Sequence, residues 1–236
     1  MDENAVETLL VGATKLRELQ VDSGYEIHEQ STEHFGELLK AHMLAVGTIG
    51  TVLSRRESEG AKVAHGLQQQ AALISSFIQG INIVDSSISE GHYSQATVLI
   101  HNELETIIAL EETTQAETVT KEGSKAVIVP KSLTKLYSDF IDIDEKAVHN
   151  MLATILSSES TQPQTSTTGL LMAQQFNEKK SWQLFGLHVS LLIVLAIHIN
   201  EYYQTIYGEE EGLNDIELEA LINAEKILVN CGWLTK

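Results

Sequence analysis

One uninterrupted apolar segment places the strongest limit on how this chain can fold. The segment runs from Leu184 to Ile199 (LFGLHVSLLIVLAIHI) and is the most apolar part of the 236-residue sequence. It is short for a membrane span and contains two histidines, His188 and His198. We therefore expect a core helix that other parts of a soluble protein bury on all sides.

Two longer segments carry the pattern of paired helices. In both Ser31 to Ser54 and Gly60 to Ser89, apolar residues recur at alternating steps of four and three, and the short polar sequence SRRESEG separates the two segments. This spacing is typical of helices that pack side by side as an antiparallel hairpin. Gly47 and Gly50 would allow a neighbouring helix to approach the first of them closely. We predict an all-α fold, an elongated helical bundle built on this long antiparallel hairpin.

Turn and loop sequences divide the rest of a single domain, residues 1–236. VDSGYE predicts a turn after a first helix, and Asp142 or Asp144 is a candidate N-cap where another helix begins. SSESTQPQTSTTG, residues 157–169, predicts a mobile linker because it is rich in Ser, Thr and Gln. The other helices are expected at about 5–19, 94–117 (with Ser94 as N-cap), 131–141, 180–207 and 215–230.

Charge and cysteine content limit the partners and the compartment. The net charge is -18 and only 15 Lys and Arg residues are present, which disfavours a surface for nucleic acid. A lone cysteine, Cys231, cannot form an internal disulfide, so we expect a cytoplasmic protein. Because the most apolar segment is short for a membrane span, we expect no contact with a membrane. The exposed ends of a long hairpin commonly pack against a second copy, so we expect a protein partner, most simply a homodimer.

Polar residues interrupt the apolar stripes of three predicted helices. His42 and Gln70 occupy positions where Leu or Ile would be more stabilising, and they would meet if the hairpin turns near Glu57. Such a pair can fix the register of two helices, or it can hold a ligand or metal. Glu103 and Glu111 fall on the apolar side of a helix, where a carboxylate needs a lysine, a tyrosine, backbone amides or a metal as its partner.

Familiar catalytic motifs are absent from the sequence. The paired Glu-x-x-His motif of di-iron bundles does not occur, because no glutamate is followed by a histidine three residues later. The sequence also contains no G-x-S-x-G, H-E-x-x-H or paired C-x-x-C motif and no Gly-rich phosphate loop. These absences predict no metal and no cofactor, and they favour a non-catalytic protein.

Two stretches resemble a family of bacterial helical proteins of unknown function. They are ISSFIQGINIVDSSISEGHYSQATVLIHNELE and LTKLYSDFIDIDEKAVH, and the resemblance covers about residues 64–149. That family is similar to the HEPN group of helical bundles, several of which act in RNA cleavage, toxin–antitoxin pairs or phage defence. The resemblance implies that Glu105, Tyr137 and His149 are matching polar positions, while His101 stands where the family has arginine.

One departure from the HEPN group concerns its ribonuclease motif, an arginine followed by four to six residues and a histidine. After Arg56, eight residues precede the next histidine, His65, so the motif is absent. Our leading hypothesis is a non-catalytic helical interaction or regulatory protein, for example a subunit in a bacterial or phage defence or toxin–antitoxin system. The alternative is an enzyme or a binder of a small ligand or nucleotide, with a site of His101, Glu105, Tyr137 and His149 inside the bundle, where a histidine could act as base or ligand.

Overall fold

Every regular element in the described part of the chain is a helix, as the apolar patterns predicted. The computed structural model describes residues 3–57, 67–114, 129–140, 143–157, 176–208 and 212–233. The all-α prediction is therefore confirmed for these ranges. The helices are α1 (Glu3–Glu57), α2 (Gln68–Ser89), α3 (Tyr93–Thr114), α4 (Lys131–Phe140), α5 (Glu145–Leu156), α6 (Glu178–Tyr207) and α7 (Asp215–Asn230).

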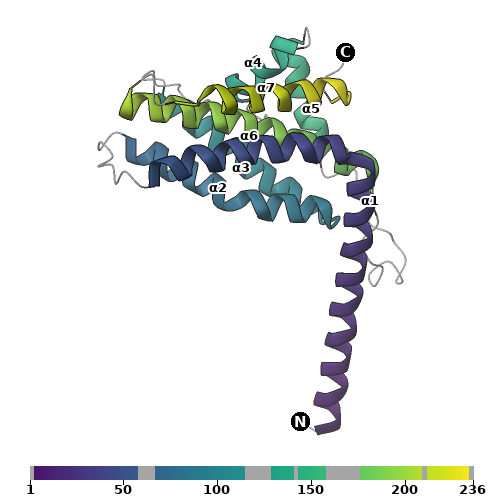
Figure 1. Ribbon diagram of the computed structural model, residues 1–236. Coiled ribbons are helices and arrows are strands. Elements are labelled where there is room, and N and C mark those ends of the chain that lie inside the picture. Colours follow the sequence, from purple (N-terminus) through teal and green to yellow (C-terminus); the bar gives the residue numbers. More distant parts are fainter. Residues whose placement is uncertain are drawn as a thin grey trace, which may run out of the picture.

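Helix α6 is the centre of the bundle. It packs against each of the other six helices, which surround it on several sides (Figure 1). All residues from Leu184 to Ala196 are buried, including His188 and Ser190. The apolar segment is thus a core helix, and the expectation of burial on all sides is confirmed.

Two helices are long and apolar enough to cross a membrane, judged by length and composition alone. They are α2, with a mean hydropathy of 1.3 in its most apolar window, and α6, with 1.9. In α6, 83% of that window is buried inside the bundle, which is the property of a core helix rather than of a helix facing lipid. In α2 the buried share is 33%.

Helix α1 runs without a break through the sequence VDSGYE, so the predicted turn there is wrong. The helix bends instead at Phe35, whose φ and ψ of -119° and 24° are not helical. Gly24 lies beside the side chain of Glu90, and Ile27 is only 2% exposed, so this part of α1 packs on the bundle as a helix. Residues 3–23, which we call the projecting segment, extend away from the bundle (Figure 1).

The second half of α1 lies along the bundle antiparallel to α2, but its main neighbours are α6 and α7 (Figure 1). Helix α2 packs chiefly against α3, the next helix in the chain. The predicted apolar stripe of α1 is partly confirmed, since Phe35 and Ile49 are buried whereas Leu39 and Val46 are only half-buried. The most deeply buried residues on this half of α1 are Leu38, Ala41, Ala45, Ile49 and Val52.

The ends of the shorter helices are capped by side chains. Asp144 accepts a hydrogen bond from the backbone N–H of Ala147 and begins α5, as one of the two predicted N-caps. Ser94 is not an N-cap, because α3 already begins at Tyr93. Residue 142 and the predicted linker beyond Ser157 lie outside the described residues.

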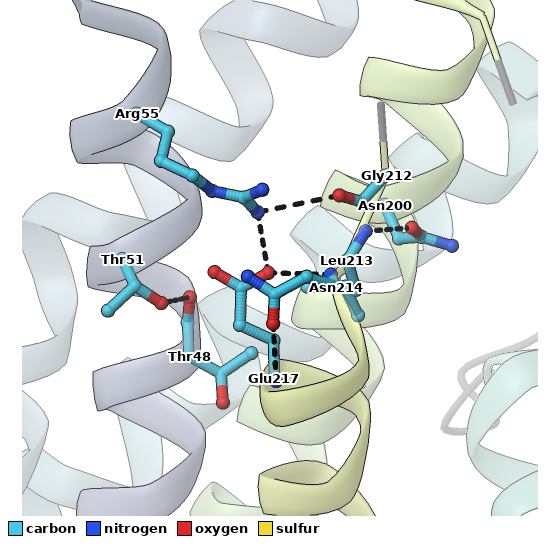
Figure 2. Close-up of polar contacts among 8 residues, drawn as sticks. All are labelled: Thr48, Thr51, Arg55, Asn200, Gly212, Leu213, Asn214 and Glu217. Atoms are coloured by element: carbon cyan, nitrogen blue, oxygen red, sulfur yellow. Dashed lines mark hydrogen bonds and ion pairs between the residues drawn. The ribbon is translucent and has the colours of Figure 1, made fainter. Parts of the chain in front are cut away.

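A polar junction holds the start of α7 against α1. Arg55 of α1 donates to Glu217 Oε2 over 2.5 Å and to the carbonyl of Gly212 (Figure 2). Asn214 and Glu217 form a capping box, in which each side chain accepts a hydrogen bond from the backbone N–H of the other residue (Figure 2). Asn200 of α6 accepts from the N–H of Leu213. The junction therefore ties α1, α6 and α7 together at one end of the bundle.

A side chain packs closely on Gly186, whereas nothing packs closely on Gly47 or Gly50. A side chain added at Gly47 or Gly50 would meet nothing within 4 Å, so the predicted close approach of a helix there is wrong. At Gly186, by contrast, an added methyl group would overlap the ring of Trp233. The indole N–H of Trp233 also donates to the hydroxyl of Ser190 over 3.2 Å, which holds the ring on α6.

Gly186→Ala should displace the Trp233 ring and destabilise the protein by about 1–3 kcal/mol, the usual effect of overpacking a core. The free energy of unfolding in urea and the tryptophan emission maximum would measure both effects. Gly80→Ala in α2 is the matched control, because its added methyl group meets nothing within 4 Å. The control should leave the protein as stable or slightly more stable. Equal stabilities of the two variants would contradict the packing of Trp233 on Gly186.

Candidate functional site

The four residues of the predicted site do not come together. His101 and Glu105 are both exposed on α3, and His149 is half-buried on α5. Tyr137 of α4, in contrast, is fully buried. No hydrogen bond or ion pair within the described ranges joins any two of the four. This arrangement does not support a common catalytic site for them.

Tyr137 is a core residue rather than an acid–base group. Burial raises the pKa of its phenol to about 12, an increase that the neighbouring Ser190 and Trp233 side chains limit. The phenol therefore stays protonated at neutral pH and cannot act as a base there. Its neighbours place it beside α6 and the segment that follows α7, where it fills the core.

A histidine and a glutamate form the main polar contact of the interior. Nδ1 of His188 on α6 lies 2.9 Å from Oε2 of Glu103 on α3, and these side chains are only 0% and 5% exposed. The burial that was predicted for Glu103 is confirmed. Its partner is a histidine, which was not among the partners expected. The sequence feature that could have indicated this partner is His188, a polar residue inside the most apolar segment.

The ring of His42 on α1 packs beside the ring of His188. Its ring lies 5.5 Å from that of His188 and 5.4 Å from that of Phe185, measured between ring centroids. Burial, and then the nearby His188, lower the pKa of His42 to about 3. His42 is therefore neutral at physiological pH. We call Glu103, His188 and His42 the polar core; it joins α1, α3 and α6.

The other two predicted interior residues occupy separate places. Gln70 is buried, as expected, but it lies beside His198 rather than near His42. His188 and His198 are ten residues apart on α6, or about 15 Å, so the predicted meeting of His42 and Gln70 is wrong. Glu111 is half-buried and accepts hydrogen bonds from the backbone N–H groups of Lys131 and Ser132. It therefore caps the start of α4, which is one of the partner types expected for it.

Removing one member of the polar core should be costly. Glu103→Ala would leave the imidazole of His188 buried without its partner and should lower the free energy of unfolding by about 3–5 kcal/mol. Glu105→Ala, two residues along and exposed, should change it by less than about 0.5 kcal/mol. Urea unfolding followed by circular dichroism would compare the two. A cost for Glu103→Ala as small as that of the control would contradict the buried contact.

The neutral state of His42 predicts how stability depends on pH. Below pH 6.5 the unfolded chain binds a proton at His42, whereas the folded chain does not until about pH 3. The proton equilibrium of His42 therefore leaves the free energy of unfolding unchanged above pH 6.5. As the pH is lowered from 6.5 toward 3, it reduces the free energy of unfolding by at most about 1.4 kcal/mol per pH unit. His42→Leu should show a shallower loss of stability than the wild type in urea unfolding at mildly acidic pH, whereas His101→Gln should not. Identical pH dependence of wild type and His42→Leu would refute this role.

A second set of polar residues lines a cavity near the C-terminal end of α6. The cavity measures about 320 Å³ and lies between α2, α3 and α6. Gln70 and His198 are buried in its wall, while Glu201 is about half exposed. Its remaining lining residues are Leu67, Ile74, Leu110, Thr113, Tyr202 and Thr205. We call this space the end cavity. It contains a His, a Glu and a Tyr, but none of the four residues that were predicted to form such a site.

Spacing along α6 could have indicated this group of residues. His198, Glu201, Tyr202 and Thr205 recur at steps of three, one and three, which places them on one face of a helix. That pattern does not by itself separate a lined cavity from a solvated helix end. The contribution of Gln70 from α2 depends on tertiary packing.

Neither the arrangement of metal-binding side chains nor comparison with known proteins identifies a function. Within the described ranges, no group of three or more His, Cys, Asp or Glu side chains is arranged to hold a metal ion. Comparisons with models of protein families, with curated proteins and with solved structures found no match.

Proposed function

We propose that this chain is a non-catalytic helical interaction or regulatory protein that binds a second copy of itself through the projecting segment of α1. The observation that carries the proposal is the continuation of α1 beyond the bundle (Figure 1). A subunit in a bacterial or phage defence or toxin–antitoxin system, acting in the cytoplasm, is the setting that the sequence resemblance suggests.

Helix stability supports a partner for the projecting segment. A helix of about twenty residues without tertiary contacts is marginally stable in water, and most helices in proteins are stabilised by packing of an apolar face. Val11 and Val21 of this segment are each 51% exposed, and Tyr25, two residues beyond it, is 74% exposed. A turn of 100° per residue places the three within an arc of about 80° on one side of α1. This exposed apolar side is suited to a helix of a partner.

The interior of the bundle supports a structural rather than catalytic use of its polar residues. Glu103 and His188 join α3 to α6, Glu111 caps α4, and Arg55 joins α1 to the capping box of α7. The residues of the predicted catalytic site are divided between the surface and the core. These contacts are those of a rigid scaffold that presents a helix for binding.

Disrupting the exposed side of α1 should separate the two copies. The double variant Val21→Glu, Tyr25→Glu places like charges on the proposed interface, so the dimer of the wild type should become a monomer. Native mass spectrometry and size-exclusion chromatography with light scattering would measure the mass. Met43→Glu is the control, because Met43 is 72% exposed on the part of α1 that lies along the bundle. A wild type that is monomeric at micromolar concentration, or a double variant that remains dimeric, would refute the proposal.

A further inference from the structure

The end cavity combines an apolar lining with buried polar groups that lack partners. Leu67, Ile74 and Leu110 supply its apolar wall. His198 is 8% exposed, and neither of its ring nitrogens has a hydrogen-bond partner in the part of the chain that the structure describes. A buried polar atom without a partner is costly, and a ligand that enters the cavity could satisfy it. The volume of about 320 Å³ is at the lower end of the range for small-molecule sites.

The polar atoms of the cavity are suited to accept hydrogen bonds. Nδ1 of His198 lies 3.4 Å from Oε2 of Glu201. When the proton is on Nδ1, facing this carboxylate, Nε2 is left as an acceptor. The buried amide of Gln70, which lines the same cavity, also has a carbonyl oxygen that can accept a hydrogen bond. A ligand that donates several hydrogen bonds would therefore match the wall of the cavity.

The charge of the cavity selects against anions. The neighbouring His198 lowers the pKa of Glu201, so its carboxylate is ionised at neutral pH. None of the described lining residues is a lysine or arginine that could bind a phosphate or carboxylate, and Lys135 of α4, outside the lining, also lowers the pKa of Glu201. The aromatic ring of Tyr202 adds a surface that attracts cations. This set of residues does not suit the nucleotide considered from the sequence.

We propose that the end cavity binds a small organic amine in its ammonium form, with an apolar body of about ten non-hydrogen atoms. The ammonium group would lie at the mouth of the cavity, between Glu201 and the ring of Tyr202. Its N–H groups would donate to Glu201 and to the free acceptors of His198 and Gln70. The apolar body would pack on Ile74 and Leu110. This site is separate from the projecting segment, so the proposal does not depend on dimer formation.

Three probes of similar shape test the charge and the site together. They are 2-phenylethylamine, which is cationic at neutral pH, 2-phenylethanol, which is neutral, and 3-phenylpropanoate, which is anionic. Isothermal titration calorimetry and thermal unfolding of the full chain would measure binding. The amine should bind saturably and raise the unfolding temperature. The alcohol should bind at least tenfold more weakly, and the carboxylate should not bind.

Substitution of Glu201 distinguishes binding in the end cavity from general attraction of a cation to an acidic protein. Glu201→Gln should weaken binding of 2-phenylethylamine about tenfold and leave the weak binding of 2-phenylethanol unchanged. The side chain of Glu201 is 53% exposed, so the substitution should not disturb the fold. Glu105→Gln, on an exposed part of α3, should change neither affinity. The proposal is overturned if the amine does not bind, if the alcohol binds as tightly, or if Glu201→Gln retains the amine affinity.

Discussion

The burial of α6 is the constraint on which the rest of the structure depends. An apolar helix that offers no side to water must be covered by other helices, and α6 packs against all six of them. The histidines of α6 are then enclosed by the other helices. His188 contacts Glu103 of α3, whereas His198 lies in the wall of the end cavity together with Gln70. The polar core and the end cavity are thus two consequences of placing histidines in the central helix.

Several helix starts that depend on local sequence were predicted correctly, although Ser94 is not an N-cap. The start of α7 at Asp215, the start of α4 at Lys131 and the N-cap Asp144 follow from capping preferences and from the breaks in apolar periodicity. The burial of α6 follows from its uninterrupted apolar sequence, and the burial of Glu103 follows from its position on the apolar side of α3. Each of these features depends on the sequence of a single helix and its ends.

Features that depend on distant contacts were not predictable from the sequence. The segment VDSGYE has the composition of a turn, yet it remains helical where Gly24 and Ile27 pack on the bundle. His42 was paired with Gln70 by counting along a hairpin, but His42 packs beside His188 of α6, whereas Gln70 lines the end cavity with His198, ten residues further along that helix. The candidate site of His101, Glu105, Tyr137 and His149 rested on resemblance alone. Nothing in their spacing specifies whether four residues on three helices share a cavity.

The place of α6 in the chain has a consequence for biosynthesis. Helices α1, α2 and α3 precede it and are complete by Thr114, whereas α6 begins only at Glu178. Ribosomes add about 5–20 residues per second, so several seconds pass between the synthesis of the earlier helices and the synthesis of the helix that covers their apolar faces. During that interval the nascent chain exposes the surfaces that chaperones bind. The production of soluble protein should therefore depend on translation speed and chaperone supply more strongly than in a bundle whose core helix is made first.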